Sequence, residues 1–227
     1  MKRIGIMTTG GDCSGLNTAI NRIVRGADMR GWDVIGIIDG TDGFCDNPPR
    51  TIELNTETLP LAESRLAGSI LHNGNAGAMN FETAATSGKL ALFNRRFKRG
   101  LASLNLDALI LIGGNGSISL AWANRELYQD LQLICIPKTI DMDMPLTERT
   151  IGFDTALNTV IDSIDKIRDT ATSHDRTYVI EVMGRNAGDI ALWAGMAGGA
   201  ESILIPEESH DMNDIINKLN RGHDRGK

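Results

Sequence analysis

The sequence predicts an α/β fold with a doubly wound, mostly parallel sheet, followed by the start of a second, similar α/β subdomain. Short apolar runs alternate with longer amphipathic stretches, and glycine-rich turns stand directly after several of the apolar runs. The chain has 227 residues, 41% of them hydrophobic and 23% charged, which is enough for one large domain and part of a second. Together these observations favour repeated βαβ units.

Six apolar runs are predicted to be buried parallel strands because they are short and bounded by glycine or polar residues: residues 4–8, 33–38, 107–112, 133–136, 178–182 and 202–205. The amphipathic stretches predict helices over residues 16–30, 88–104, 117–131, 155–171, 189–197 and 213–220. Residues 40–61 show no period and are expected to form a surface loop. This pattern predicts a Rossmann-like three-layer domain over residues 1–146 and an incomplete second domain over residues 147–227.

Charge and cysteine content narrow the classes of partner. The net charge is -6 and no block of Lys and Arg is present, which argues against nucleic acid. The three cysteines are widely spaced and odd in number, so neither a zinc pattern nor a disulfide framework is predicted. No apolar run is long enough to cross a bilayer and no signal peptide is visible, so we expect a cytoplasmic protein.

Two glycine-rich turns are candidates for phosphate binding. One is GGDCSGLN, beginning at Gly10, and the other is IGGNGS, beginning at Ile112. Glycine lets the backbone approach phosphate oxygens, and the N-terminus of the following helix presents free N–H groups. Such turns are also common in α/β folds without a ligand, and neither matches a standard nucleotide motif. Two of them at strand ends of one sheet could clamp a polyphosphate from both sides.

A third candidate is PKTIDMDMP, which begins at Pro137 after a predicted strand. Asp141 and Asp143 are two residues apart, so in an extended segment their side chains point the same way. This arrangement suits a base that takes a hydroxyl proton beside a carboxylate that orients it or a metal. The alternative is a polar turn that caps the strand, which is the commoner role of an isolated pair of this kind.

A fourth candidate is VMGRNAG, beginning at Val182 at another predicted strand-to-helix turn. Arg185 in this turn could bind phosphate or stabilise a transferring phosphoryl group, although a lone Arg there is more often a surface residue. Arg176 offers a second cation upstream. His174 is interpreted as a local hydrogen-bonding residue.

In this order and spacing, GGDCSGLN, IGGNGS, PKTIDMD, TIGFDTALNTVIDSIDKIRDTATSH and EVMGRNAG resemble the phosphofructokinase family, in particular its bacterial 6-phosphofructokinases, along the whole chain. The resemblance implies transfer of the ATP γ-phosphate to the 1-hydroxyl of fructose 6-phosphate, a step of glycolysis. It also implies Mg²⁺ as cofactor, allosteric control and a homo-oligomer, which is a tetramer in the family.

The resemblance assigns roles to individual residues. Asp141 would be the base, with Thr139 and Asp143 beside it, and Arg185 would stabilise the transferring group. The implied donor contacts are Gly11, Asn75, Ala76, Gly114, Asn115, Gly116, Ser117 and Lys138. The implied substrate contacts are Thr139, Ile140, Asp141, Arg176, Met183, Gly184 and Arg185, with Arg176 reaching the substrate of a neighbouring subunit. The implied effector-site residues are Arg25, Arg168 and Glu201.

The sequence departs from the family pattern at four positions. Asn115 stands where the family has an Asp that holds Mg²⁺, so metal binding should weaken. Asn75 replaces an Arg that bridges donor phosphates, Met142 replaces the Asn of TIDND, and Asn21 replaces an effector-site Arg.

The chain stops at Lys227, where family members continue, so we expect a C-terminally truncated form with impaired turnover and unstable or absent oligomers. Two alternatives stay open at this point. One is a non-catalytic homologue or fragment that binds nucleotide or a partner subunit. The other is a pyrophosphate-dependent enzyme, since Lys138 accompanies pyrophosphate use in the family. We favour ATP because Gly116 leaves room for a nucleotide.

Overall fold

The computed structural model describes residues 2–59, 64–74, 90–123, 125–129, 131–174 and 176–224. The chain divides into two compact units, Met1–Thr139 and Ile140–Lys227. The division expected from the sequence, after residue 146, falls slightly further along the chain than this one.

The first unit is built on a sheet whose strands are β1 (Arg3–Thr8), β2 (Asp33–Ile37), β3 (Thr51–Leu54), β4 (Ala108–Gly113) and β5 (Gln132–Thr139). Their order is β3-β2-β1-β4-β5. β1 pairs in parallel with β2 and β4, and β4 pairs in parallel with β5, whereas β3 is antiparallel to β2. The predicted mostly parallel sheet is therefore confirmed.

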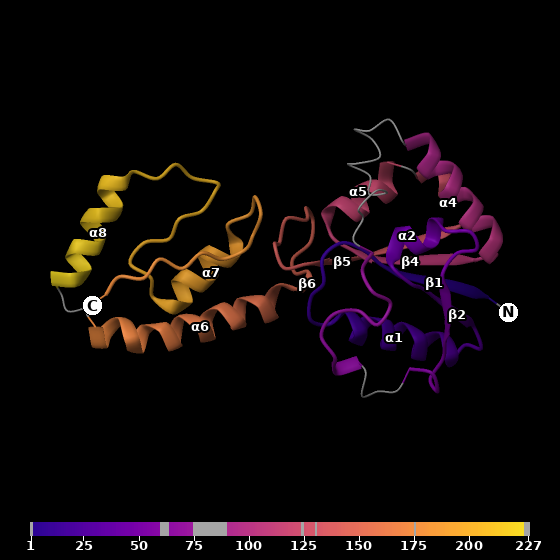
Figure 1. Cartoon of the computed structure of the whole chain (residues 1–227), viewed down its shortest axis with the longest axis horizontal. Helices are drawn as coiled ribbons and strands as arrows, with labels where there is room; N and C mark the ends of the chain where they lie inside the picture. The colour runs from indigo at the N-terminus through magenta and orange to yellow at the C-terminus, as the bar shows by residue number, and fades with distance from the viewer. Residues whose placement is uncertain are drawn as a thin grey trace. The chain divides into compact units, whose positions relative to one another are not determined.

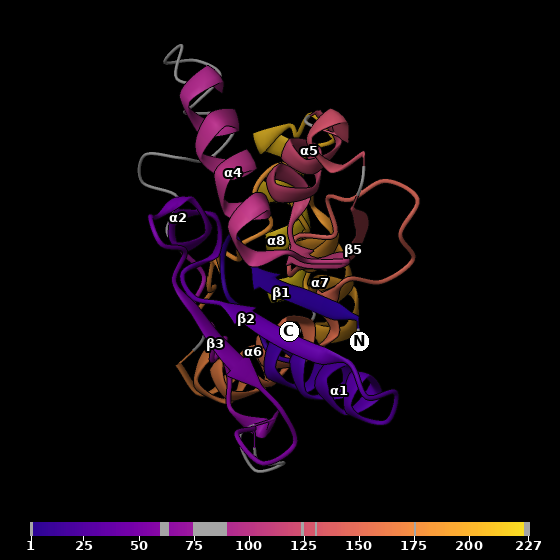
Figure 2. The same cartoon turned by 90° about the vertical axis from the view of Figure 1, so that its right-hand side faces the viewer.

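Helices cover both faces of this sheet (Figures 1 and 2). α1 (Leu16–Asp28) lies on one face, and α2 (Gly40–Cys45), α4 (Leu90–Leu104) and α5 (Asn115–Ala123) lie on the other, followed by the short 3₁₀ helix η2 (Arg125–Tyr128). The central strands β1 and β4 are buried along almost their whole length, as expected when helices cover both faces. The result is the three-layer, doubly wound arrangement.

The core between α2, α4 and the sheet depends on three phenylalanines. Phe44 and Phe97 have ring centroids 4.5 Å apart, and Phe93 and Phe97 have theirs 5.7 Å apart. All three rings are fully buried. Such aromatic burial is a major contribution to the hydrophobic stability of a small core.

The expectation of an irregular surface loop over residues 40–61 was wrong, because the segment contains α2 and β3. A β-carbon on Gly43 would lie 1.9 Å from the carbonyl oxygen of Ile38, so only glycine allows α2 to pack this closely. Tertiary packing around Phe44 therefore overrides the low helix propensity of this glycine-containing stretch. β5 also extends to Thr139, three residues beyond the predicted strand end at Ile136.

The second unit contains β6 (Ile151–Gly152), α6 (Phe153–His174), α7 (Asp189–Gly198) and α8 (Met212–Asp224). α6 and α7 pack closely, since a β-carbon on Gly198 would lie 2.9 Å from a methyl carbon of Ile164. Residues 178–182 and 202–205, predicted as strands, are not strands in the structure. A strand needs a neighbour with which to exchange backbone hydrogen bonds, and β6 is the only strand among the described residues of this unit.

Among the helices that the structure describes, none combines the length and the apolar character needed to cross a membrane.

Candidate functional site

Three strand ends of the first unit meet, as the sequence predicted for two of the glycine-rich turns. Thr9, directly after β1, donates its backbone N–H to the carbonyl oxygen of Ile112 at 3.0 Å. A β-carbon on Gly113 would lie 2.6 Å from Thr9 Oγ1 and 2.7 Å from Ser117 Cβ, so the close approach of the two turns requires glycine here.

The end of β5 lies against the same turns. A β-carbon on Gly114 would lie 3.3 Å from the carbonyl oxygen of Lys138 and 3.9 Å from Thr139 Cβ. One on Gly10 would lie 3.6 Å from Lys138 Nζ and 3.7 Å from Ser117 Oγ. The structure thus places the turn after β1, the start of α5 and the end of β5 together.

Two glycines of this site face open space. A β-carbon on Gly11 or on Gly116 would meet no described atom within 4 Å. Gly116 is the second residue of α5, whereas α1 begins further along the chain from Gly11, at Leu16, and has no side-chain hydrogen bond at its N-cap, Gly15. The first N–H groups of a helix without such a cap can donate to an anion, and the helix dipole favours negative charge there.

Lys138 places a buried cation beneath the first turn. Its side chain is 2% exposed, and Nζ donates a hydrogen bond to the carbonyl oxygen of Gly11. Burial lowers the pKa of Lys138, while the nearby Cys13 and Asp12 act in the opposite direction. Burial likewise raises the pKa of the Cys13 thiol to about 11, with Lys138 opposing the shift. Cys13 is therefore a protonated thiol at neutral pH and a poor nucleophile.

Asn115 is the first residue of α5, and its Oδ1 accepts a hydrogen bond from Ser119 Oγ at 3.2 Å. In the part of the chain that the structure describes, no group of three or more His, Cys, Asp or Glu residues could hold a metal ion. Mg²⁺ is usually bound by one or two carboxylates together with substrate phosphates and water. Asn115 would offer an uncharged oxygen in place of a carboxylate, so this turn would hold Mg²⁺ only together with a polyphosphate.

Asn75 and Ala76, two predicted donor contacts, lie outside the described residues. The segment that precedes them, residues 64–74, is hydrogen-bonded to α1 and to the turn after β1. Asn17 on α1 is 1% exposed; its Nδ2 donates to the carbonyl oxygen of Leu66 at 2.9 Å, and its Oδ1 accepts from Ile70 N–H at 2.8 Å. Gly74 forms a parallel bridge with Thr9. The segment therefore ends directly beside the turn after β1.

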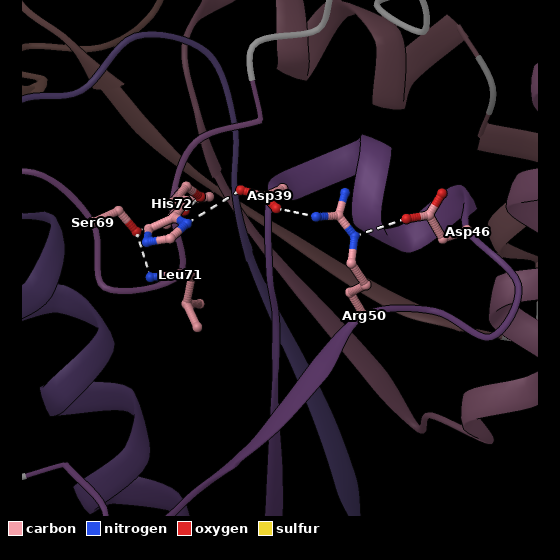
Figure 3. A network of polar contacts seen from close by, with 7 residues as sticks. Asp39, Asp46, Arg50, Ser69, Leu71 and His72 are labelled. Carbon is pink, nitrogen blue, oxygen red and sulfur yellow. Dashed lines mark hydrogen bonds and ion pairs between the residues drawn. The ribbon is translucent and has the colours of Figure 1, made fainter.

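A polar network fixes the other side of this segment (Figure 3). Asp39 Oδ1 lies 3.3 Å from His72 Nδ1, and Asp39 Oδ2 accepts a hydrogen bond from Arg50 Nη1. Arg50 Nε also donates to Asp46 Oδ2 at 2.7 Å, and Ser69 Oγ accepts from Leu71 N–H at 3.2 Å. Both Asp39 and His72 have left-handed backbones, with φ values of 56° each. Asp and His adopt this conformation more readily than most residues other than glycine, and the network holds both side chains in place.

The second unit contains the aspartate pair. Asp141 and Asp143 flank Met142, whose φ of 56° is left-handed. The expectation that this segment is extended is therefore wrong, because a left-handed residue breaks the alternation of side chains along a strand. Ile140, an expected substrate contact, begins this unit directly after Thr139.

Arg185 lies in a tight turn of the second unit, in which Ala187 N–H donates to the carbonyl oxygen of Gly184 at 2.9 Å. A β-carbon on Gly184 would lie 2.4 Å from the carbonyl oxygen of Ala187, and Arg185 has a φ of 57°. Met183, just before the turn, is 73% exposed. Arg176, exposed, follows α6, and its N–H donates to the carbonyl oxygen of Ala171 at 3.1 Å.

The predicted effector residues fall in different places. Arg25, in the last turn of α1, donates from Nε to Asn21 Oδ1 at 3.0 Å. Arg168 and Glu201 lie in the second unit, where a β-carbon on Gly199 would approach Arg168 Nη2 to 3.6 Å and one on Gly222 would approach Glu201 Cγ to 3.0 Å.

Comparison with known proteins identifies the family to which the chain belongs. The sequence pattern of the family described as phosphofructokinase matches residues 3–227. The chain belongs to the phosphofructokinase family. It is 48% identical over 227 residues to the ATP-dependent 6-phosphofructokinases of Bacillus subtilis (strain 168) and Bacillus velezensis, covering the whole of this chain and 67% of each relative.

Solved phosphofructokinase structures share the fold. That of Saccharomyces cerevisiae has a TM-score of 0.83 and 29% identity, covering 100% of this chain and 32% of the yeast chain. The pyrophosphate-dependent phosphofructokinase of Marinobacter aquaeolei has a TM-score of 0.75 and 18% identity, covering 97% of this chain and 57% of its own. The second likeness shows the fold alone.

Several residues of this candidate site were not singled out from the sequence. Thr9 and Asn17 hold the first turn and the following segment in place, and Asp39 and His72 act through a contact between residues 33 positions apart. Only the inclusion of Asn17 in GGDCSGLN could have drawn attention to any of them.

Proposed function

We propose that this chain is an ATP-dependent 6-phosphofructokinase, which transfers the γ-phosphoryl group of ATP to the 1-hydroxyl of fructose 6-phosphate. The observation that carries the proposal is its 48% identity, along its whole length, to curated relatives of that name. Among the described residues, no atom lies within 4 Å of a β-carbon on Gly11 or Gly116, and this supports a phosphoryl donor at the turns of the first unit.

The proposed step is in-line transfer. Asp141 accepts the proton of the sugar 1-hydroxyl as that oxygen attacks the γ-phosphorus; the bond from phosphorus to the β,γ-bridging oxygen breaks, and ADP leaves. Thr139 and Asp143 would act beside the base, and Arg185 would offset charge on the transferring group. Mg²⁺ would neutralise charge on the donor phosphates, with Asn115 offering one uncharged oxygen ligand.

Lys138 and Gly116 decide our choice of donor. Lys138 is the observation that favours pyrophosphate as a second candidate, because it adds a cation near the donor turn. Its ammonium is buried and donates to Gly11, however, while Gly116 leaves open space for a nucleotide. We therefore assign ATP as the donor.

The remaining family properties are proposed on the resemblance. Fructose 6-phosphate would contact Ile140, Met183 and Gly184 in addition to the catalytic residues, and Arg176 would reach the substrate of a neighbouring copy in a homo-oligomer. We also propose a cytoplasmic, allosterically controlled enzyme. Because Arg25 is hydrogen-bonded to Asn21, which replaces a cation, we expect weaker binding of anionic effectors than in relatives with Arg at that position.

The test of these roles is single-turnover transfer from radiolabelled ATP to fructose 6-phosphate, with wild type and Asp141→Asn compared. We expect the variant to be slower by roughly a hundredfold to ten-thousandfold. Exposed Asp211→Asn is the matched control. Equal rates in wild type and Asp141→Asn would remove Asp141 from the role of base.

A further inference from the structure

The segment over residues 140–150 contains two non-glycine residues with left-handed backbones, Met142 with φ 56° and Leu146 with φ 61°. The β-carbon makes this conformation unfavourable, and Asn or Asp tolerates it better than Met. Strained conformations of this kind persist only where surrounding structure fixes them, and they concentrate at functional sites. The position of Met142, between Asp141 and Asp143, raises the question of what holds it.

A contact with Thr150 holds Met142. Thr150 Oγ1 donates to Met142 Sδ at 3.4 Å, and Thr150 is 5% exposed. The carbonyl oxygen of Thr150 accepts the N–H of Phe153, the fully buried first residue of α6, at 3.3 Å. Thr150 is therefore hydrogen-bonded to the first residue of a 22-residue helix. Its side chain in turn restrains Met142, which lies near the other end of the segment over residues 140–150.

Arg149, the neighbour of Thr150, adds a second attachment. Its guanidinium lies over the ring of Phe153 at 5.3 Å and over the ring of Trp193 on α7 at 5.7 Å. Its Nε lies 3.7 Å from Asp154 Oδ1. Cation–π contacts to two rings restrict the position of Arg149, and with it the end of the segment at Thr150.

We propose that Thr150 and Met142 are positioning residues for the proposed phosphoryl transfer: their contact closes the segment and fixes the backbone that carries Asp141 and Asp143. The inference rests on the proposed function, because it assumes that these carboxylates act on the sugar hydroxyl. A sulfur atom is a weak acceptor, so the contact acts by restricting the segment more than by its own strength. A misplacement of reacting groups by about 1 Å can lower the catalytic rate about a hundredfold.

Variants at both ends of the contact test the proposal. Thr150→Val and Met142→Leu each remove the contact, Thr150→Ser keeps the hydroxyl, and Met142→Asn supplies a residue that tolerates the left-handed conformation. We expect kcat to fall about tenfold in Thr150→Val and Met142→Leu, with both KM values within about twofold of wild type. Thr150→Ser should remain close to wild type. In the Met142→Asn background, Thr150→Val should have little further effect, which a double-mutant cycle measures.

Amide hydrogen exchange at residues 141–144 gives a readout that does not need turnover. We expect exchange there to become about tenfold faster in Thr150→Val and not in Thr150→Ser. If neither this chain nor this chain extended with the C-terminal part of its Bacillus subtilis relative shows turnover, the proposed function fails, and exchange alone decides whether the contact restrains the segment. Exchange in Thr150→Val that equals that of the wild type would overturn the proposal. So would a fall in kcat caused by Thr150→Val that is equally large in the wild-type and in the Met142→Asn background.

Discussion

Lys138 Nζ donates a hydrogen bond to the backbone carbonyl oxygen of Gly11, which joins the end of β5 to the turn after β1. The contact connects residues 127 positions apart in the sequence. It places the ammonium group of Lys138, a residue that is 2% exposed, directly beneath the turn to which we assign the donor phosphates.

Replacement of Lys138 by an uncharged residue should weaken the affinity for ATP without lowering the melting temperature. Because burial lowers the pKa of Lys138, its charged form costs folding free energy, and this cost diminishes as pH rises through the lowered pKa towards 10.5. We therefore expect Lys138→Met to melt no lower than wild type while its affinity for ATP falls about tenfold, because the donor phosphates lose the attraction of a positive charge beneath the turn. Calorimetry and thermal melts measure both, with exposed Lys218→Met as control. A lower Tm with unchanged ATP affinity would show that Lys138 stabilises the fold and does not contribute to binding of the donor.

Asn115→Asp should strengthen binding of the magnesium complex of ATP, because a carboxylate supplies the charge that an amide oxygen lacks and also suits the first turn of α5. We expect affinity to rise severalfold in Mg²⁺ and to fall in EDTA. Ser119→Ala is the matched control, since it removes the hydrogen bond to Asn115 Oδ1 without adding charge. Equal affinity of Asn115→Asp and wild type in Mg²⁺ would show that this turn does not contact the metal.

Gly116→Asp should weaken the binding of ATP. The open space at Gly116 would receive a carboxylate close to the proposed nucleotide, which combines steric exclusion with repulsion between like charges. We expect KM for ATP to rise at least about tenfold, whereas Gly116→Ala should change it by no more than about twofold. Steady-state kinetics with ATP distinguishes the two. The assignment of the nucleotide to this turn fails if Gly116→Asp binds ATP as well as Gly116→Ala does.

The buried thiols predict a loss of stability at alkaline pH. Burial raises the pKa of Cys13 from 9.0 to about 11 and that of Cys45 from 9.0 to about 12. Their stabilising contribution is complete below pH 9.0 and is lost as pH rises towards these raised values, because the unfolded state gives up its protons first. Thermal melts between pH 7 and 11 should show a smaller decrease in Tm for Cys45→Ala than for wild type. An equal decrease in Tm for Cys45→Ala and wild type would show that ionisation of the Cys45 thiol does not cause the loss of stability.

Much of the fold could be predicted because its strands are short apolar runs with glycine at their ends. The runs at residues 4–8 and 107–112 became β1 and β4 with shifts of one residue. α2 could not be predicted, because the burial of Phe44 decides it and local helix propensity opposes it. β3 was missed because it is a short stretch that depends on antiparallel pairing with β2. The runs at residues 178–182 and 202–205 have strand-like composition, yet a strand also requires a partner.

The gathering of Gly11, Gly114 and Lys138 followed from the rule that parallel strands present their carboxyl ends at one edge of a sheet. The left-handed conformation of Met142 did not follow, because the sequence gives no signal for it in a methionine. The contacts of Asn17 and Asp39 were also beyond sequence reasoning, since each joins segments far apart in the chain.

The formation of fructose 1,6-bisphosphate, with ATP and with pyrophosphate as alternative donors, tests the central claim most directly. Since the chain covers 67% of its Bacillus subtilis relative, the coupled assay is run on this chain and on one extended with the remaining C-terminal part of that relative. We predict that the extended protein forms the product with ATP and Mg²⁺, with kcat/KM for ATP at least about tenfold above that for pyrophosphate. A folded, extended protein that forms product only with pyrophosphate, or with neither donor, would contradict the account.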